Sequence, residues 1–285
     1  MDIEQLSQHL AIASGALGEN IPVADLARLK LALLSFREEH RPDKVQFWGR
    51  IRGLDNDYYI MVASTQLKGV PFPKRQFFWS NDRFNFSPLP EVTPSMSAQL
   101  KSVNGYFTGD HHKIILKNQH TSNNSFDPND DLSVIQKGNQ KHNITELDRL
   151  SAVVQSIDME CAIVPYESQK SLVTGELLEN VGYQGQKPEE IGKLSSYRHY
   201  RLSDEKTRLQ IHVQSEKKAV NTLETLEHDI PKSCWSVLHD SSKLLALVRN
   251  FKWPGFLCYN RANTVSYGYC YFGDGRKVND LMFTS

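Results

Sequence analysis

The sequence predicts an α+β fold in which an N-terminal helical hairpin packs with a mainly antiparallel β-sheet core. In the first forty residues apolar side chains recur every three or four positions, and in several later segments they recur every second position. The strand patterns are grouped, and no strand–helix–strand alternation is visible. The 285 residues are read as one domain over 1–285, long enough to bury a core without disulfides or metals.

Residues 1–41 are predicted to form the helical N-terminal segment. The first apolar stripe comprises Ile3, Leu6, Leu10, Ala13 and Leu17, and the second comprises Leu26, Leu29, Leu33 and Phe36. Asn20 is expected to cap the second helix, with Pro22 in its first turn. Arg41 precedes a proline, which favours extended geometry, so the helix is expected to end there.

Two-residue periodicity begins at Val45 and predicts a hairpin over 45–63. Its first strand should turn alternate residues to opposite faces, with Val45, Phe47, Gly49 and Ile51 on one and Gln46, Trp48, Arg50 and Arg52 on the other. The turn is expected at 55–57. A third strand is predicted over 75–80. Three prolines at 88, 90 and 94 then predict an irregular stretch.

Residues 118–143 are rich in Asn, Gln, Ser and Asp and are predicted to form a mobile polar insertion. Thr145 is expected to cap a third helix, whose stripe comprises Leu147, Leu150, Val154 and Ile157. A short buried strand is predicted over 161–165. Pro188 predicts a further short helix running to about Tyr197, and residues 202–225 read as polar and loosely helical.

The C-terminal third is predicted to be β-structure, with strands over 234–240, 244–250, 253–260 and 266–273. In the last strand Tyr267, Tyr269 and Tyr271 should share one face. Gly255 is expected to adopt a backbone conformation that other residues avoid.

The charge balance argues against nucleic-acid and membrane partners. Lys and Arg number 33, Asp and Glu also number 33, and the formal net charge is +0. Binders of duplex nucleic acid usually carry a basic stripe, and none is present. The first residues show no basic and apolar pattern of a signal peptide, and the apolar runs are too short for a transmembrane span. The four cysteines lack CxxC spacing and are predicted to be free core residues in a reducing compartment.

Each candidate catalytic motif has a structural interpretation. The run 273–277 lacks the P-loop spacing and is interpreted as a hairpin turn. Residues 227–229 (Glu-His-Asp) alternate in direction and favour a structural hydrogen-bonding cluster. Adjacent histidines at 111–112 rarely bind one metal. A pair of Cys161 with His142 stays open, although a lone buried cysteine is more often a packing residue.

Aromatic side chains on strands are the candidate interface residues, because Trp and Tyr are enriched in interface hot spots. The candidates are Trp48, Tyr59, Trp235, Tyr267 and Tyr269, each of which could instead lie in the chain's own core. No catalytic, cofactor-binding or metal-binding residues are expected.

Seven segments, in order, resemble the radial spoke head protein 9 family of motile cilia and flagella. They are VQFWGRIRGLDNDYYI (45–60), YFTGD (106–110), LDRLSAVVQSIDMECAIVP (147–165), LSSYRHYR (194–201), LEHDIPKSCWSV (226–237), WPGFLCYN (253–260) and YGYCYFGDGRKVNDLMF (267–283). Each segment alone is weak evidence of the resemblance, but seven segments in the same order make it specific. Together they extend over essentially the whole chain.

The resemblance implies a non-enzymatic subunit of the axonemal radial spoke head, needed for spoke-head assembly and for relaying central-pair signals to the dyneins. It implies radial spoke head proteins 4 and 6 and radial spoke protein 3 as partners, with the central pair reached indirectly. The expected location is the cytoplasm, cytoskeleton and axoneme. Two alternatives remain open from the residues: an enzyme whose site is dispersed in sequence, and a cytoplasmic β-rich protein-binding module.

Overall fold

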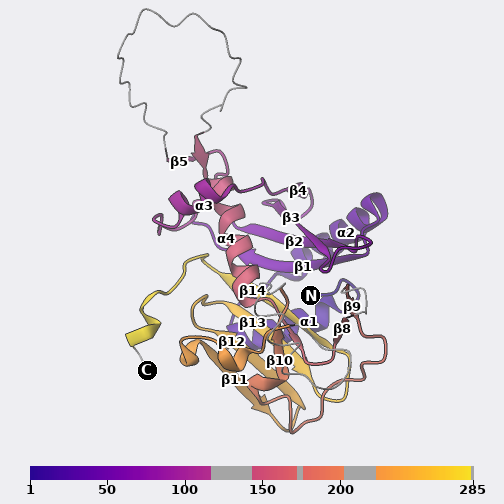
Figure 1. Cartoon of the computed structure of the whole chain (residues 1–285). Helices are drawn as coiled ribbons and strands as arrows, with labels where there is room; N and C mark the ends of the chain where they lie inside the picture. The colour runs from indigo at the N-terminus through magenta and orange to yellow at the C-terminus, as the bar shows by residue number, and fades with distance from the viewer. Residues whose placement is uncertain (117–142, 172–175, 202–222, 284–285) are drawn as a thin grey trace, which may run out of the picture.

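The computed structural model describes residues 1–116, 143–171, 176–201 and 223–283. Its main feature is an eight-stranded sheet (Figure 1). The first four strands are β1 (Lys44–Ile51), β2 (Tyr58–Thr65), β3 (Lys74–Ser80) and β4 (Ser87–Pro88). The other four are β11 (Trp235–Asp240), β12 (Leu245–Asn250), β13 (Phe256–Arg261) and β14 (Tyr267–Gly273). The predicted strands at both ends of the chain are therefore confirmed.

The strand order is β11-β12-β13-β14-β1-β2-β3-β4. All neighbours are antiparallel except β1 and β14, which run parallel and join the two groups into one sheet. A mixed α+β fold with a mainly antiparallel sheet, as predicted, is confirmed.

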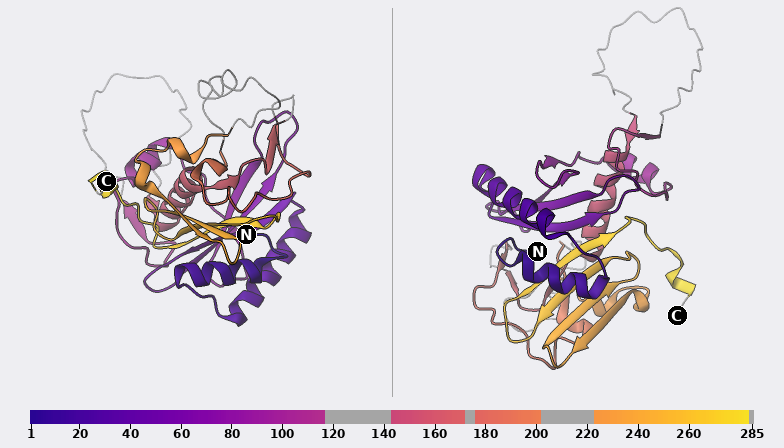
Figure 2. Two further views of the ribbon diagram at one scale, coloured as in Figure 1. Left: turned by 90° about the horizontal axis from the view of Figure 1, so that it is seen from below. Right: turned by 180° about the vertical axis from the view of Figure 1, so that it is seen from behind.

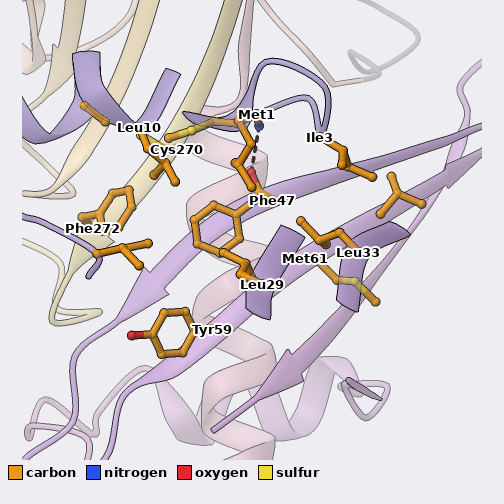
Figure 3. Packing of buried hydrophobic residues seen from close by; sticks show 14 of the residues in the cluster. Met1, Ile3, Leu10, Leu29, Leu33, Phe47, Tyr59, Met61, Cys270 and Phe272 are labelled. Carbon is orange, nitrogen blue, oxygen red and sulfur yellow. Dashed lines mark hydrogen bonds between the residues drawn. The ribbon is translucent and has the colours of Figure 1, made fainter. Parts of the chain in front are cut away.

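Two N-terminal helices, α1 (Leu6–Leu17) and α2 (Val23–His40), cover one face of the sheet (Figure 2). Their predicted stripes are confirmed, since Leu6, Leu10, Leu29 and Leu33 are all buried. Figure 3 shows Leu10, Leu29 and Leu33 in the same cluster as Phe47, Met61, Cys270 and Phe272 from the strands. Each fully buried leucine stabilises the fold by about 1.5–3 kcal/mol, so this layer is a substantial part of the core.

The opposite face is covered by α4 (Glu146–Cys161). Thr145 caps it as predicted: its side chain accepts a hydrogen bond from the Asp148 amide while the Asp148 carboxylate accepts one from the Thr145 amide. The predicted stripe packs against the sheet through Leu150, Val154 and Ile157, whose side chains are fully buried.

Glu146, in the first turn of α4, is a buried carboxylate that fixes the 106–110 loop. Its oxygens accept hydrogen bonds from the Tyr58 hydroxyl at 2.9 Å, from the Gly109 amide at 2.8 Å and from the amide and hydroxyl of Thr108. These charge-assisted bonds compensate for burying the charge.

The predicted alternation of β1 is wrong beyond Trp48. A register shift between Phe47 and Gly49 inserts a bulge, so Trp48 and Ile51 pack into the same cluster under α4, although alternation placed them on opposite faces. An added residue in one strand reverses the facing of everything beyond it. The two-residue periodicity correctly predicted a strand here, but it did not reveal the bulge that changes which face the later side chains take.

The two predicted ends of α2 need correction. Pro22 is at the N-cap position and no side chain caps the helix, so the Asn20 cap is wrong. The helix does stop at Arg41, but that residue is left-handed, with φ 46° and ψ 47°, and not extended.

Two further local predictions are wrong. The proline-rich stretch contains the short strand β4 and a helix, α3 (Pro94–Leu100), whose N-cap Thr93 accepts a hydrogen bond from the Met96 amide. Proline is well tolerated at the first helical position, which the prediction overlooked. The helix predicted after Pro188 is instead a series of turns followed by the 3₁₀ turn η1 (Leu194–Ser196).

Short strand pairs complete the described chain. They are β5 (Ile114–Leu116) with β6 (Ile144–Thr145), β7 (Ile163–Pro165) with β10 (Tyr197–His199), and β8 (Gln169–Ser171) with β9 (Leu177–Glu179). Three more 3₁₀ turns are η2 (Leu226–His228), η3 (Lys232–Cys234) and η4 (Asp280–Phe283). The buried strand predicted over 161–165 corresponds to β7.

Residues 117–142 and 202–222 lie outside the described chain, and so do the predictions of a mobile insertion and a loosely helical segment there. None of the described helices has the length and apolar character needed to cross a bilayer. All four cysteines are buried and unpaired, as predicted.

Candidate protein interface

The structure divides the five predicted interface residues into two groups. Trp48, Tyr59 and Trp235 are buried within the chain's own core, with exposed fractions of 1%, 2% and 5%. Tyr267 and Tyr269 are only partly buried, on the stretch of β14 that precedes its pairing with β1. Only the second group offers surface to a partner without rearrangement of the core.

Trp235 belongs to a buried polar cluster with His199 and Asp229. The Asp229 carboxylate accepts hydrogen bonds from the Trp235 indole at 2.6 Å and from His199 Nε2 at 2.9 Å. Burial alone would raise the pKa of Asp229, but these two donors outweigh it and lower the pKa. The structural role predicted for the 227–229 run is therefore borne out at Asp229.

Tyr269 is tied to Trp48 through a second buried network. The carboxylate of Asp158, on α4, accepts hydrogen bonds from the Trp48 indole and the Tyr269 hydroxyl, both at 3.1 Å, and forms an ion pair with Arg75. The Arg75 guanidinium also donates to the Tyr269 hydroxyl at 2.5 Å and lies over the Tyr200 ring. Burial by itself would lower the pKa of Arg75, but Asp158 and the tyrosines raise it.

A cleft of about 650 Å³ opens beside Tyr267 and Tyr269. Its lining residues come from the N-terminal segment, the start of β1, the end of β2, the β8–β9 hairpin and the start of β14. Figure 1 labels these strands. β1 and β14 pair only from Gly49 to Ile51 on β1. Next to the preceding part of β1, the Met1 amine donates to the Phe47 carbonyl at 2.8 Å (Figure 3).

Exposed apolar side chains line this cleft. Leu178, Val181 and Val265 all border it, with exposed fractions of 37%, 101% and 62%. Tyr183, Tyr200 and Tyr267 add aromatic surface. Exposed apolar groups gathered at one concavity are typical of a binding site.

Carboxylates dominate the charges of the cleft. Asp2, Asp43, Lys44 and Glu179 border it, and Lys44 is ion-paired with Glu179. Burial lowers the pKa of the Met1 amine to about 5, so this amine is neutral near pH 7. Asp2 and Asp43 therefore have no compensating charge among the described groups that border the cleft.

His9, on α1, also borders the cleft and is neutral. Burial, helped by the neighbouring Met1 amine, lowers its pKa from 6.5 to about 4. Its Nε2 lies 3.2 Å from the Ser266 hydroxyl. Its Nδ1 is buried and has no hydrogen-bond partner within the described chain.

The remaining candidate motifs do not converge on one site. The His111 ring contacts the rings of His112 and Trp79 at tilted angles, and no contact joins it to residues 227–229 within the described chain. The run 273–277 is not a hairpin turn, because no described strand follows it; Gly275 instead donates to the Tyr271 hydroxyl at 3.0 Å. Cys161 is buried, and His142 lies outside the described residues. Among the described residues no group of three His, Cys, Asp or Glu side chains could hold a metal ion.

Sequence reasoning identified the two tyrosines of the cleft but missed its rim. Leu178 lies in the three-residue strand β9, Val181 lies in a turn and Val265 in a bend. In such short segments an apolar residue is as consistent with burial as with exposure. The available signal was that Leu178 and Val181 flank the polar pair 179–180, which is unusual for a core strand.

Comparison with known proteins identifies relatives that share one name. No protein-family model matches the chain. The chain is 33% identical over 285 residues to the radial spoke head protein 9 homolog of Bos taurus, 32% over 290 residues to that of Homo sapiens, and 30% over 288 residues to that of Danio rerio. Each alignment covers 99% of this chain and 99% of the relative. The chain belongs to the radial spoke head protein 9 family.

Proposed function

We propose that this chain is a non-catalytic structural subunit of the axonemal radial spoke head. In this role it is needed for spoke-head assembly and for relaying central-pair signals that regulate dynein-driven motility. The observation that carries the proposal is the identity of 30–33% to radial spoke head protein 9 homologs over 99% of each chain. Similarity of that extent leaves no large unmatched region in which a separate activity would have to reside.

The proposed location is the cytoskeleton of the cilium or flagellum. The proposed partners are other spoke-head subunits, namely radial spoke head proteins 4 and 6, and radial spoke protein 3. The central pair is contacted indirectly, and neither nucleic acid nor membrane is a proposed partner. The near-equal numbers of basic and acidic residues, 33 of each, are compatible with protein partners.

The fold supports a role as one rigid building block. Strands from residues 44–88 and from residues 235–273 share one sheet, so the two ends of the described chain cannot move as independent domains without breaking the β1–β14 pairing. We therefore propose that residues 1–285 act as a single spokehead-like domain, with 118–143 as an insertion in it.

Within that domain Tyr267 and Tyr269 are the proposed contact residues, because they border the cleft with its exposed apolar rim. Trp48, Tyr59 and Trp235 are proposed to support the contact surface from within. A stable subunit of an assembly buries on the order of 2,000 Å² or more against its neighbours, so the cleft would be one part of a larger interface.

Cryo-electron tomography of axonemes from a strain lacking the chain tests the proposal. Spoke heads should be defective and the beat abnormal, while dynein ATPase activity persists. Re-expression of the chain should restore both. Complete spoke heads and a normal waveform in the null strain would reject the structural role and favour the enzyme or the cytoplasmic binding module.

A further inference from the structure

We infer that the cleft between β1 and β14 binds an extended segment of another spoke-head subunit, one that carries apolar side chains and at least one Lys or Arg. The inference rests on the proposed function for the source of the segment. Its location and its chemistry come from the residues around the cleft.

The sheet itself provides backbone groups for such a segment. In an antiparallel ladder, successive residues bond alternately to one neighbour and the other. The Phe272 amide donates to Gly255, on the β13 side, at 2.9 Å, so the odd-numbered residues of β14 turn their backbone toward β1. β1 meets them only from Tyr271 onward. The amide and carbonyl groups of Tyr267 therefore face the cleft, and an extended segment can pair with them. The Tyr269 carbonyl, by contrast, already accepts a hydrogen bond from the Met1 amine at 3.5 Å.

The apolar rim of the cleft favours apolar side chains on the incoming segment. Val181 is fully exposed and Val265 is 62% exposed, although both border a concave site. An apolar side chain laid against them would remove this surface from water. The volume of about 650 Å³ is large enough for several side chains but too small for a folded domain.

The carboxylates at the cleft favour a basic residue on the incoming segment. Asp2 and Asp43 are exposed carboxylates at the cleft, whereas its one lysine is already paired with Glu179. A Lys or Arg on the incoming segment would complement them, and an acidic segment would be repelled.

Site-specific photo-crosslinking in reconstituted axonemes tests the inference. Val181 or Val265 is replaced by p-benzoylphenylalanine in the full chain, which is then returned to the null strain. Val23, which is 82% exposed at the start of α2, is the control position. Mass spectrometry should map crosslinks from both cleft positions, and not from Val23, to an apolar segment of another spoke-head subunit that contains Lys or Arg.

Three results would overturn the inference while spoke heads assemble normally: no crosslink from the cleft, crosslinks only to this chain itself, or crosslinks to an acidic segment. They leave the proposed function intact. If the unmodified chain fails to restore spoke heads in the null strain, the proposed function fails instead, so the two failures are distinguishable.

A substitution series gives a second measurement. Val181→Asn with Val265→Asn removes the two most exposed apolar side chains of the rim without touching the core, and Val23→Asn is the matched control. The double variant should require roughly tenfold more protein to restore spoke heads, on the basis of the apolar area lost. Restoration at the control concentration, with unchanged thermal stability, would contradict the inference.

Discussion

The two ends of the β1–β14 pairing are stabilised by different kinds of interaction. At the closed end, Gly49 lies against the backbone of Tyr271, with φ 151°, and a Cβ there would lie 2.1 Å from the Tyr271 carbonyl oxygen. At the open end the strands diverge, and Tyr269 is anchored through side chains to Asp158 and Arg75. The closed end depends on the absence of a side chain, whereas the open end depends on charged and aromatic ones.

This difference explains where a binding surface can form. Backbone pairing at the closed end consumes the amide and carbonyl groups of both strands. At the open end the Tyr269 carbonyl accepts from the Met1 amine, and the backbone groups of Tyr267 face the cleft. The side-chain network stabilises the diverged arrangement, and Met1, which bonds to Phe47 and Tyr269, occupies part of the gap. Substitutions at the closed end should therefore disrupt folding, while those at the rim of the open end should affect binding alone.

Gly49→Val should have the largest effect. Its side chain would collide with the Tyr271 backbone in the middle of the sheet, where neither strand can move away. We expect a loss of more than about 4 kcal/mol in the free energy of unfolding, measured by chemical denaturation. Gly15→Ala is the control, because nothing lies within 4 Å of its Cβ position in α1. A Gly49→Val protein with unchanged stability would show that β1 and β14 are not in close contact.

Asp158→Ala should be the next most damaging change, at about 3–5 kcal/mol, because it leaves the buried Arg75 charge without its partner. Arg75→Met combined with Asp158→Ala should recover much of that loss, since both charges are then removed. The measurement is a double-mutant cycle by denaturation. Additive effects of the two single changes would mean that the pair is not coupled.

Gly255→Val should cost roughly 1–3 kcal/mol. Gly255 has φ 102°, as the sequence predicted, and a Cβ there would lie 2.2 Å from the Phe272 carbonyl oxygen. The effect should be smaller than at Gly49 because Gly255 lies in the loop before β13, which can shift. Thermal and chemical denaturation measure the loss of stability. A loss equal to that of Gly49→Val would show that the loop at Gly255 adapts no better than the sheet at Gly49.

His9 should make stability depend on pH. Burial lowers its folded-state pKa to about 4, whereas the unfolded side chain has a pKa near 6.5. Between these values the unfolded state binds more protons, so the free energy of unfolding should fall as pH decreases from 6.5 to 4. His9→Gln should flatten this part of the profile. The exposed His228→Gln should not, and an identical slope in all three proteins would refute the assignment.

Deletion of 118–143 should have the smallest effect. β5 pairs with β6 through Leu116 and Ile144, so the two flanks already lie together and an Asn-Gly turn can join them. The thermal midpoint should stay nearly unchanged in a calorimetric scan. A fall of tens of degrees would mean that this segment contributes to the core.

The sequence alone determined the local elements that follow from periodicity and capping. The stripes of α1 and α2, the Thr145 cap of α4 and the strands at both ends of the chain all arise from contacts between near neighbours. Such contacts leave a repeating pattern because side-chain direction is fixed by the backbone. The special conformation of Gly255 was also predictable, since it depends on one residue type.

Only the tertiary structure decided how β1 meets β14 and what lies where they part. The bulge at Phe47–Gly49, the parallel pairing and the ion pair of Arg75 with Asp158 join residues that are far apart in sequence. The same long-range packing buried Trp48, Tyr59 and Trp235 while leaving Tyr267 and Tyr269 beside a cleft. An aromatic residue on a strand has the same local pattern in either place, because burial depends on what the rest of the chain brings against it.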